Sequence, residues 1–330
     1  MGIILISVIV CGFLFEFING FHDTANAIAT AVYTKALTAK KAILLAAFMN
    51  LIGAMVSEKV AMTISGGLVD IKVHQYVILA ALTGAIIWNL FTWWRGIPSS
   101  SSHALIGSLI GASIVYTSSL NHIVWSGVIK KVIIPLITSP LIGFLLGFWV
   151  MKLIFNLLAE KSYSAVNDKF RKLQVLSSAL VAFSHGNNDA QKTMGIITLA
   201  LITGGIADPG SGVPFWVKMS CAVTMALGTS IGGWKIMKTM GGGVTKLEPS
   251  TGFVAQTASA IAIESMTWLG APVSTTQVIT TSIMGAGSAK RVTAVKWGIA
   301  RSIVSAWIFT LPISMLLGGI CSYLLGLLIV

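Results

Sequence analysis

Apolar residues in this chain gather in long runs that short polar connections separate. The runs are about 20 residues long, the length that an α-helix needs to cross the hydrocarbon core of a bilayer. Five runs precede a charged connection at 159–174, and five follow it. The pattern predicts an all-α polytopic membrane protein with spans at residues 3–34, 42–57, 76–94, 98–118 and 132–158, and then at residues 175–203, 214–232, 251–269, 271–288 and 302–328.

Two of the runs, 3–34 and 175–203, are too long for one span and contain polar residues near the middle. The first is interrupted by Glu16 and by polar residues up to Asp23, and the second by the polar segment 184–189. Non-helical backbone at membrane depth is tolerated only where protein buries it or where it lines a cavity. We therefore expect broken helices that carry a binding site at the membrane midplane.

The two halves of the chain share two motifs in the same order. One motif ends in Asp, and the other is Gly-x-Pro followed by hydroxyl residues. The matched pairs are 19–23 with 185–189 and 96–100 with 270–274. We expect two repeats of about five spans each, at 1–158 and 175–330, joined by a connecting segment at 159–174.

Charge distribution gives the orientation of the halves. Only 10% of the residues are charged, against about 25% in soluble domains, which excludes a soluble enzyme and a nucleic-acid-binding domain. Lys35, Lys40 and Lys41 follow the first long run, whereas segment 204–217 after its counterpart has no basic residue. Cytoplasmic loops collect Lys and Arg, so the halves are expected to be inverted, with segment 159–174 in the cytoplasm.

Two aspartates are the first candidates for chemistry. A carboxylate at the centre of a bilayer costs about 2.5–3.5 kcal/mol on insertion scales, so it needs a purpose or a partner. Asp23 and Asp189 stand at matched positions, and an inverted repeat would bring them together near the midplane. This arrangement predicts a site for Na⁺ or H⁺, to which Asn26 adds a polar ligand. The alternative is a structural hydrogen-bond network that closes the broken helices.

Hydroxyl clusters open two of the apolar runs, at Ser99 to Ser102 and at Ser274 to Thr276. Serine or threonine at a helix start is an ordinary cap, but four in a row exceed what capping needs. Helix N-termini carry free N–H groups and partial positive charge, which favour anions. Two such termini facing each other predict a site for a tetrahedral oxyanion. The alternative is capping and helix packing alone.

Three other charged residues lie inside apolar runs without an assigned role. Glu16 and Glu264 are costly there unless paired or hydrated, and an ion pathway is one interpretation of them. Lys192 lies one turn beyond Asp189, where it could form an ion pair or contact a substrate. The three cysteines form no CxxC pair, and the chain has no HExxH, P-loop or Rossmann motif. We therefore expect neither an enzyme nor a bound cofactor.

Four segments carry a specific resemblance, and they are N-G-F-H-D-T-A-N-A (19–27), H-G-N-N-D-A-Q-K-T (185–193), G-I-P-S-S-S-S-H (96–103) and G-A-P-V-S-T-T-Q (270–277). They resemble the paired signatures of the PiT family of inorganic phosphate transporters. The resemblance covers essentially the whole chain. It implies cation-coupled phosphate uptake by alternating access, in a homodimer within a bacterial cell membrane. It places the coupling ions at Asp23, Asn26 and Asp189, and phosphate at Thr24, Ser100, Ser101, Asn188, Ser274, Thr275 and Thr276.

The sequence thus predicts a secondary active symporter for inorganic phosphate, driven by Na⁺ or H⁺. Another tetrahedral oxyanion such as sulfate, a metal-phosphate complex and an anion channel are the alternatives. Two carboxylates beside the site favour an anion that enters with cations or carries a proton. Phosphate can donate a hydrogen bond to Asp23 or Asp189, whereas sulfate at neutral pH cannot.

Overall fold

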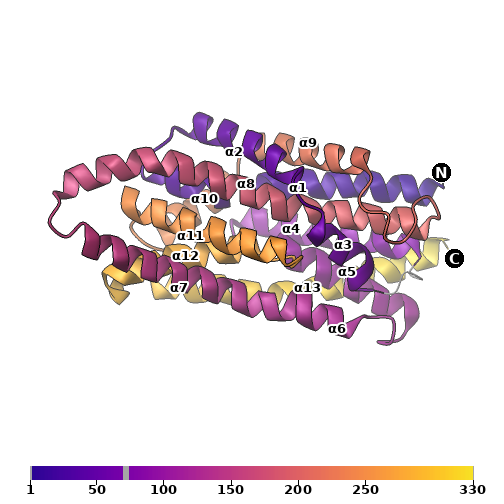
Figure 1. Cartoon of the computed structure of the whole chain (residues 1–330). Coiled ribbons are helices and arrows are strands. Elements are labelled where there is room, and N and C mark those ends of the chain that lie inside the picture. Colours follow the sequence, from indigo (N-terminus) through magenta and orange to yellow (C-terminus); the bar gives the residue numbers. More distant parts are fainter. Residues whose placement is uncertain (1, 70–73, 330) are drawn as a thin grey trace.

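The computed structural model describes residues 2–69 and 74–329, and these residues form a bundle of helices (Figure 1). The first half contains α1 (Ile3–Tyr33), α2 (Ala39–Ala54), α3 (Lys59–Gly67), α4 (Gln75–Arg95), α5 (Ser101–Thr117), α6 (Trp125–Val128), the π-helix η1 (Ile129–Ile133) and α7 (Ile134–Leu157). The second half contains α8 (Tyr163–Thr203), α9 (Phe215–Ile231), α10 (Trp234–Lys238), the π-helix η2 (Thr239–Gly243), α11 (Pro249–Trp268), α12 (Thr275–Lys290), the 3₁₀-helix η3 (Val292–Ala294) and α13 (Trp297–Ile329). Both termini lie at one end of the bundle, and the α7–α8 turn lies at the other end.

The two halves have matching elements in the same order. Helix α1 corresponds to α8, the α2–α3 pair to α9 with α10 and η2, and α4 to α11. The 17-residue α5 corresponds to the 16-residue α12, and the continuous helix from α6 to α7 corresponds to α13. Even the two isolated β-bridges occupy matching places, Val69 with Ile123 and Thr245 with Val295.

Helices α1 and α8 differ from the expectation of broken helices. Each is a single helix, of 31 and 41 residues, that continues through its polar segment. The predicted breaks inside runs 3–34 and 175–203 are therefore wrong. The reason is that neighbouring helices supply partners for several of the buried polar side chains, as when Thr193 donates to Glu16, so the backbone can stay helical.

The breaks lie instead between α4 and α5 and between α11 and α12. Gly96 and Gly270 end the preceding helices with φ of +68° and +70°, a left-handed conformation that glycine adopts without strain. Pro98 and Pro272 follow, and neither can continue a helix. A further break bends α3 from α2 by 65°.

The expected ten spans are not all present as such. In the described part of the chain, four helices are long and apolar enough to cross a membrane, and the bent α2–α3 pair makes up to five. Runs 98–118 and 271–288 instead form the short helices α5 and α12, which are buried almost throughout. Hydropathy does not distinguish a helix buried in protein from one that faces lipid, so both were expected to span.

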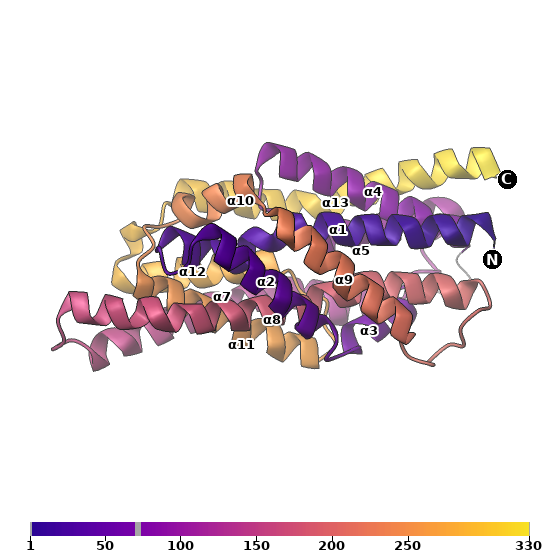
Figure 2. The same ribbon diagram turned by 90° about the horizontal axis from the view of Figure 1, so that it is seen from above.

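Each half buries its short helix against the other half. Helix α5 packs on α13, and α12 packs on α7. Gly111 leaves no room for a Cβ beside the Met315 carbonyl, and Gly285 leaves none beside the Phe144 carbonyl. These close approaches fix both short helices in the interior of the bundle (Figure 2). Helix α12 contacts α1 and α8, and the start of α5 contacts α1 through Ser101.

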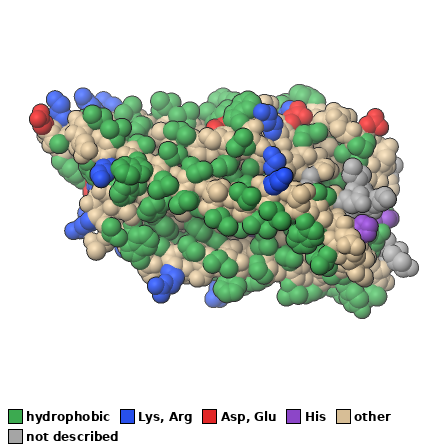
Figure 3. Space-filling view, turned by 60° about the horizontal axis from the view of Figure 1, so that its bottom comes forward, with side chains coloured by type: hydrophobic (Ala, Val, Ile, Leu, Met, Phe, Trp, Pro, Cys, Tyr) green, Lys and Arg blue, Asp and Glu red, His purple; other side chains and the backbone are tan. Residues whose placement is uncertain are grey.

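The outer face carries many exposed apolar side chains. Leu44, Phe48, Trp149, Ile308 and Leu316 are examples, each more than half exposed. In the space-filling view hydrophobic side chains spread over the middle of the molecule, with Lys and Arg present mainly toward the end of the α7–α8 turn (Figure 3). An apolar surface of this extent suits a lipid environment.

Candidate functional site

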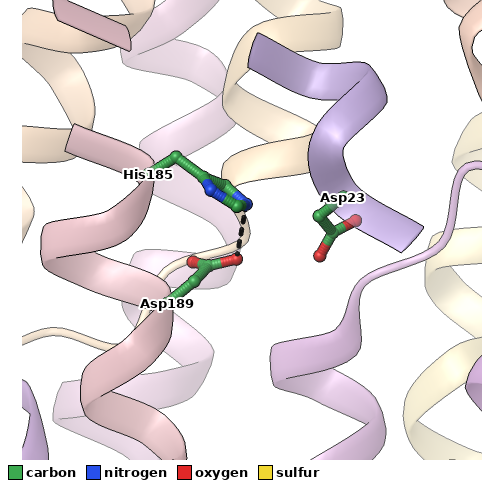
Figure 4. Close-up of side chains that lie close together, drawn as sticks. All are labelled: Asp23, His185 and Asp189. Carbon is green, nitrogen blue, oxygen red and sulfur yellow. Dashed lines mark ion pairs between the residues drawn. The ribbon is translucent and has the colours of Figure 1, made fainter. Parts of the chain in front are cut away.

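Asp23 of α1 and Asp189 of α8 come together in the centre of the bundle. Ligand atoms of Asp23, His185 and Asp189 all lie within 4.8 Å of one another, and all three residues are buried (Figure 4). Two buried carboxylates at this separation repel each other and lack hydration. They need cations or hydrogen-bond donors close by.

Hydroxyl and amide groups surround Asp23. The Ser101 hydroxyl lies 2.7 Å from Asp23 Oδ2, and the Thr276 hydroxyl donates to Asp23 Oδ1 over 3.1 Å. Asn26 Nδ2 donates to the same Oδ1 over 3.2 Å, and His22 Nδ1 lies 2.9 Å from it. Ser101 is the first residue of α5 and Thr276 the second of α12, so the starts of both short helices contact Asp23.

Asp189 has a different set of partners. Lys192 Nζ lies 2.5 Å from Asp189 Oδ1, and the two residues are three positions apart on α8. Thr275, the first residue of α12, donates to Asp189 Oδ2 over 3.1 Å. His185 Nε2 lies 3.3 Å from the same oxygen. Asp189 therefore has a fixed cation from the chain itself.

The starts of α5 and α12 meet at this place. Ser100 caps α5 by accepting from His103 N–H over 3.2 Å, and Ser274 caps α12 by accepting from Gln277 N–H over 3.3 Å. The Ser102 hydroxyl donates to the carbonyl of Val273, next to the α12 cap, over 3.0 Å. Two positive helix ends thus point at the pair of aspartates.

Asn26 and Asn188, which the sequence also singled out, lie at the same centre. Asn26 Nδ2 also donates to Thr276 Oγ1 over 2.8 Å, and Asn188 Nδ2 donates to Thr267 Oγ1 over 2.8 Å. The amide oxygens Asn26 Oδ1 and Asn188 Oδ1 are buried and have no hydrogen-bond partner among the described residues. The side chain of Thr24 lies outside the described part of the chain.

Contacts in one half have counterparts in the other. Ser101 with Asp23 corresponds to Thr275 with Asp189. His22, which matches Asn188, lies 3.1 Å from the Thr92 hydroxyl, and Asn188 donates to Thr267, one position beyond the one that matches Thr92. The site is therefore built twice from matching positions, with different residues in some of them.

Glu16 and Glu264 have hydrogen-bond partners other than the two aspartates. Glu16 accepts from Thr193 and joins α1 to α8, while Asn187 donates to Glu264 over 3.1 Å and joins α8 to α11. His22 and His185 also contact the aspartates, although neither was among the candidates expected from the sequence. The adjacency of His22 to Asp23, and the one-turn spacing of His185 and Asp189, were available signals.

Residues 19–318 match the phosphate transporter family. The chain is 48% identical over 330 residues to a probable low-affinity inorganic phosphate transporter of Bacillus subtilis, with 98% of each chain covered. It is 46% identical over 322 residues to a protein of the same description from Rhizobium meliloti, covering 97% of this chain and 96% of that one.

The fold is also similar to a solved structure titled the sodium-dependent phosphate transporter. The TM-score is 0.90 at 26% identity, and the match covers 99% of this chain and 100% of that one. These findings confirm the resemblance read from the four segments, and the relatives are transporters and not enzymes. The chain is a multi-pass membrane protein that belongs to the phosphate transporter family.

Proposed function

We propose that the chain is a secondary active symporter that carries inorganic phosphate across the bacterial cell membrane together with Na⁺. The observation that carries the proposal is the meeting of two buried aspartates with the starts of two short helices. Carboxylates attract a cation, and the N-termini of helices attract an anion, so one centre can bind both. The names of the relatives and of the structural neighbour support phosphate and sodium as the pair.

The proposed cation position is beside Asp23. Its carboxylate, the Thr276 hydroxyl and the unpartnered Asn26 Oδ1 supply oxygen atoms within one buried cluster. Hard cations prefer carboxylate, amide and hydroxyl oxygens, which favours Na⁺ at this place. Asp189 belongs to the same centre. The uptake experiment described below distinguishes Na⁺ from H⁺ as the coupling ion.

The proposed phosphate position is where α5 and α12 begin. Backbone N–H groups at these ends and the hydroxyls of the two clusters are neutral donors, which replace lost hydration without additional buried cations. The proposed ligands are Thr24, Ser100, Ser101, Asn188, Ser274, Thr275 and Thr276. Ser100 and Ser274 accept as caps through oxygen, so their hydroxyl hydrogens are left to donate.

We further propose that the two halves, 1–158 and 175–330, are inverted repeats that work by alternating access. Matching element order and matching contacts support this proposal. Segment 159–174 is assigned to the cytoplasm. Its residues from Tyr163 on form the first turns of α8, which carry exposed Lys169, Arg171 and Lys172. The homodimer implied by the resemblance is part of the proposal, and the mass of the detergent-solubilised protein tests it.

Labelled phosphate uptake into proteoliposomes tests the function. Na⁺ and pH are varied independently, with sulfate and arsenate as competitors. We expect accumulation that follows the Na⁺ gradient and that arsenate competes for more strongly than sulfate. Accumulation that follows pH alone would assign H⁺, a requirement for divalent metal would assign a metal-phosphate complex, and flux without accumulation would indicate a channel.

A further inference from the structure

We propose that the Lys192 ammonium group is a built-in cation that fills the second of two matched cation positions. The inference rests on the proposed function and deepens it. Under this proposal, the two aspartates at the centre bind only one free cation. The second positive charge is the ammonium group of Lys192, which pairs with Asp189.

The matching of Asn26 with Lys192 is the first observation. Asn26 lies three residues after Asp23 on α1, and Lys192 lies three residues after Asp189 on α8, so each shares a helix face with its aspartate. Asn26 Nδ2 donates to Thr276 Oγ1 at the start of α12, and Lys192 Nζ donates to Ser102 Oγ at the start of α5. The two residues thus occupy equivalent places, one neutral and one positively charged.

The surroundings of the ammonium are the second observation. Lys192 is 1% exposed, and its Nζ contacts Asp189 Oδ1, the Ser102 hydroxyl and the Val273 carbonyl, the last at 3.1 Å. An ammonium has three hydrogen atoms to donate, so these three oxygens satisfy it completely. Carboxylate oxygen and a carbonyl from a non-helical segment are also typical ligands of Na⁺ in broken-helix transporters. The ammonium therefore occupies a cage of oxygens that would suit a free cation.

In the described part of the first half, no lysine or arginine pairs with Asp23. No Lys or Arg nitrogen of any described residue lies within ion-pair distance of this carboxylate, and its ion-pair partner among these residues is His22. Asn26 Oδ1 is buried without a partner in the same part of the chain, so an acceptor is left for an incoming ion. Asp23 therefore has hydrogen-bond donors but no Lys or Arg partner among the described residues, whereas Asp189 has Lys192. We accordingly assign a free cation to Asp23 and the Lys192 ammonium to Asp189.

Exchange of the matched residues tests the inference. Lys192→Asn gives the second half the residue of the first, and Asn26→Lys gives the first half the residue of the second. Lys218→Asn is the control, since Lys218 pairs with Glu58 over 2.5 Å near the surface, away from the aspartates. In proteoliposomes the ratio of labelled Na⁺ flux to labelled phosphate flux is measured for each protein.

We expect Lys192→Asn to gain about one Na⁺ per phosphate, because Asp189 then requires a free cation. Asn26→Lys should lose dependence on Na⁺, and Lys218→Asn should match the parent. An unchanged flux ratio in Lys192→Asn, with weaker phosphate affinity, would overturn the inference and make Lys192 a substrate contact. If Lys192→Asn does not fold, Lys192→Gln replaces it under the same criteria.

A second measurement separates this inference from the proposed function. The melting temperature of each purified protein is followed as Na⁺ replaces choline, without phosphate. Lys192→Asn should show stabilisation by Na⁺ with one more binding site than the parent. If the parent accumulates no phosphate but this difference is found, the proposed function fails and the built-in cation stands. If the folded variant responds to Na⁺ as the parent does, the built-in cation is excluded.

Discussion

Thr276 on α12 donates a hydrogen bond to Asp23 on α1 over 3.1 Å, and this contact joins the two halves of the chain. The hydroxyl belongs to the helix start proposed for phosphate, and the carboxylate belongs to the position proposed for the cation. One side chain therefore contacts both sites. Under the proposed function, binding at either site would orient the same hydroxyl, which gives a physical route for coupling the two substrates.

Loss of that hydroxyl should weaken coupling. Thr276→Val keeps the shape and removes a hydrogen bond to a charged group, which contributes about 1.5–3 kcal/mol. We expect the Na⁺ concentration for half-maximal phosphate uptake to rise about tenfold or more. Thr281→Val is the control, because Thr281 on the same helix donates to the carbonyl of Gln277. Equal effects of the two substitutions would contradict the role of Thr276.

The two aspartates should both be needed for accumulation but should differ in their effect on stability. Asp23→Asn and Asp189→Asn should each abolish concentrative uptake, since the amide carries no charge to offset a cation. Asp189→Asn also leaves the Lys192 ammonium unpaired in the interior. Removing one partner of a buried ion pair costs roughly 3–5 kcal/mol, so its melting temperature should fall further than that of Asp23→Asn.

The control for the aspartates is Asp168→Asn, whose partner Arg171 is exposed. An exposed pair contributes about 0–1 kcal/mol, so uptake and melting temperature should both stay near the parent values. Normal phosphate accumulation in Asp23→Asn or Asp189→Asn would show that the substituted aspartate is not needed for coupling. Identical melting temperatures for the two would contradict the ion pair with Lys192.

The hydroxyl clusters should separate into two kinds of residue. Ser101→Ala and Thr275→Ala remove hydroxyl donors from the proposed phosphate position, so apparent phosphate affinity should fall about tenfold. Ser100→Ala and Ser274→Ala also remove helix caps, which lowers stability by about 1 kcal/mol. Affinity and melting temperature are measured together. Stability losses without any loss of affinity would place the anion elsewhere.

Accessibility from each side tests the topology. The α7–α8 and α8–α9 connections lie at opposite ends of the bundle (Figure 1). The first contains the exposed Ser162 and the second the exposed Ser211, and each is replaced by a single cysteine. A membrane-impermeant thiol reagent should label Ser162→Cys only from the cytoplasmic side and Ser211→Cys only from outside. The cysteines of the parent chain are a background that is measured in parallel. Labelling of both from one side would refute the inverted arrangement.

Much of the helical pattern was predictable from the sequence, because apolar runs and Gly-Pro breaks are local signals. The proximity of Asp23 to Asp189 followed from their matched positions. The continuity of α1 and α8 was not predictable. It depends on donors such as Thr193 from a distant segment, which cover polar groups that would otherwise break the helix.

Two further features depend on tertiary packing in the same way. The burial of α5 and α12 against the opposite half is invisible to hydropathy, which ranks protein-facing and lipid-facing residues alike. The partners of Lys192 also lie on other segments, at Ser102 and Val273, so the sequence offered only the ion pair with Asp189 as one of two interpretations.

The central claim is that this centre couples phosphate to Na⁺. Its most direct test is the uptake of labelled phosphate into proteoliposomes that hold the purified protein, under an inward Na⁺ gradient with pH equal on both sides. We predict phosphate accumulation above the external concentration, and collapse of that accumulation when a sodium ionophore removes the gradient. Phosphate that only equilibrates, or accumulates equally under a K⁺ gradient, would contradict the account.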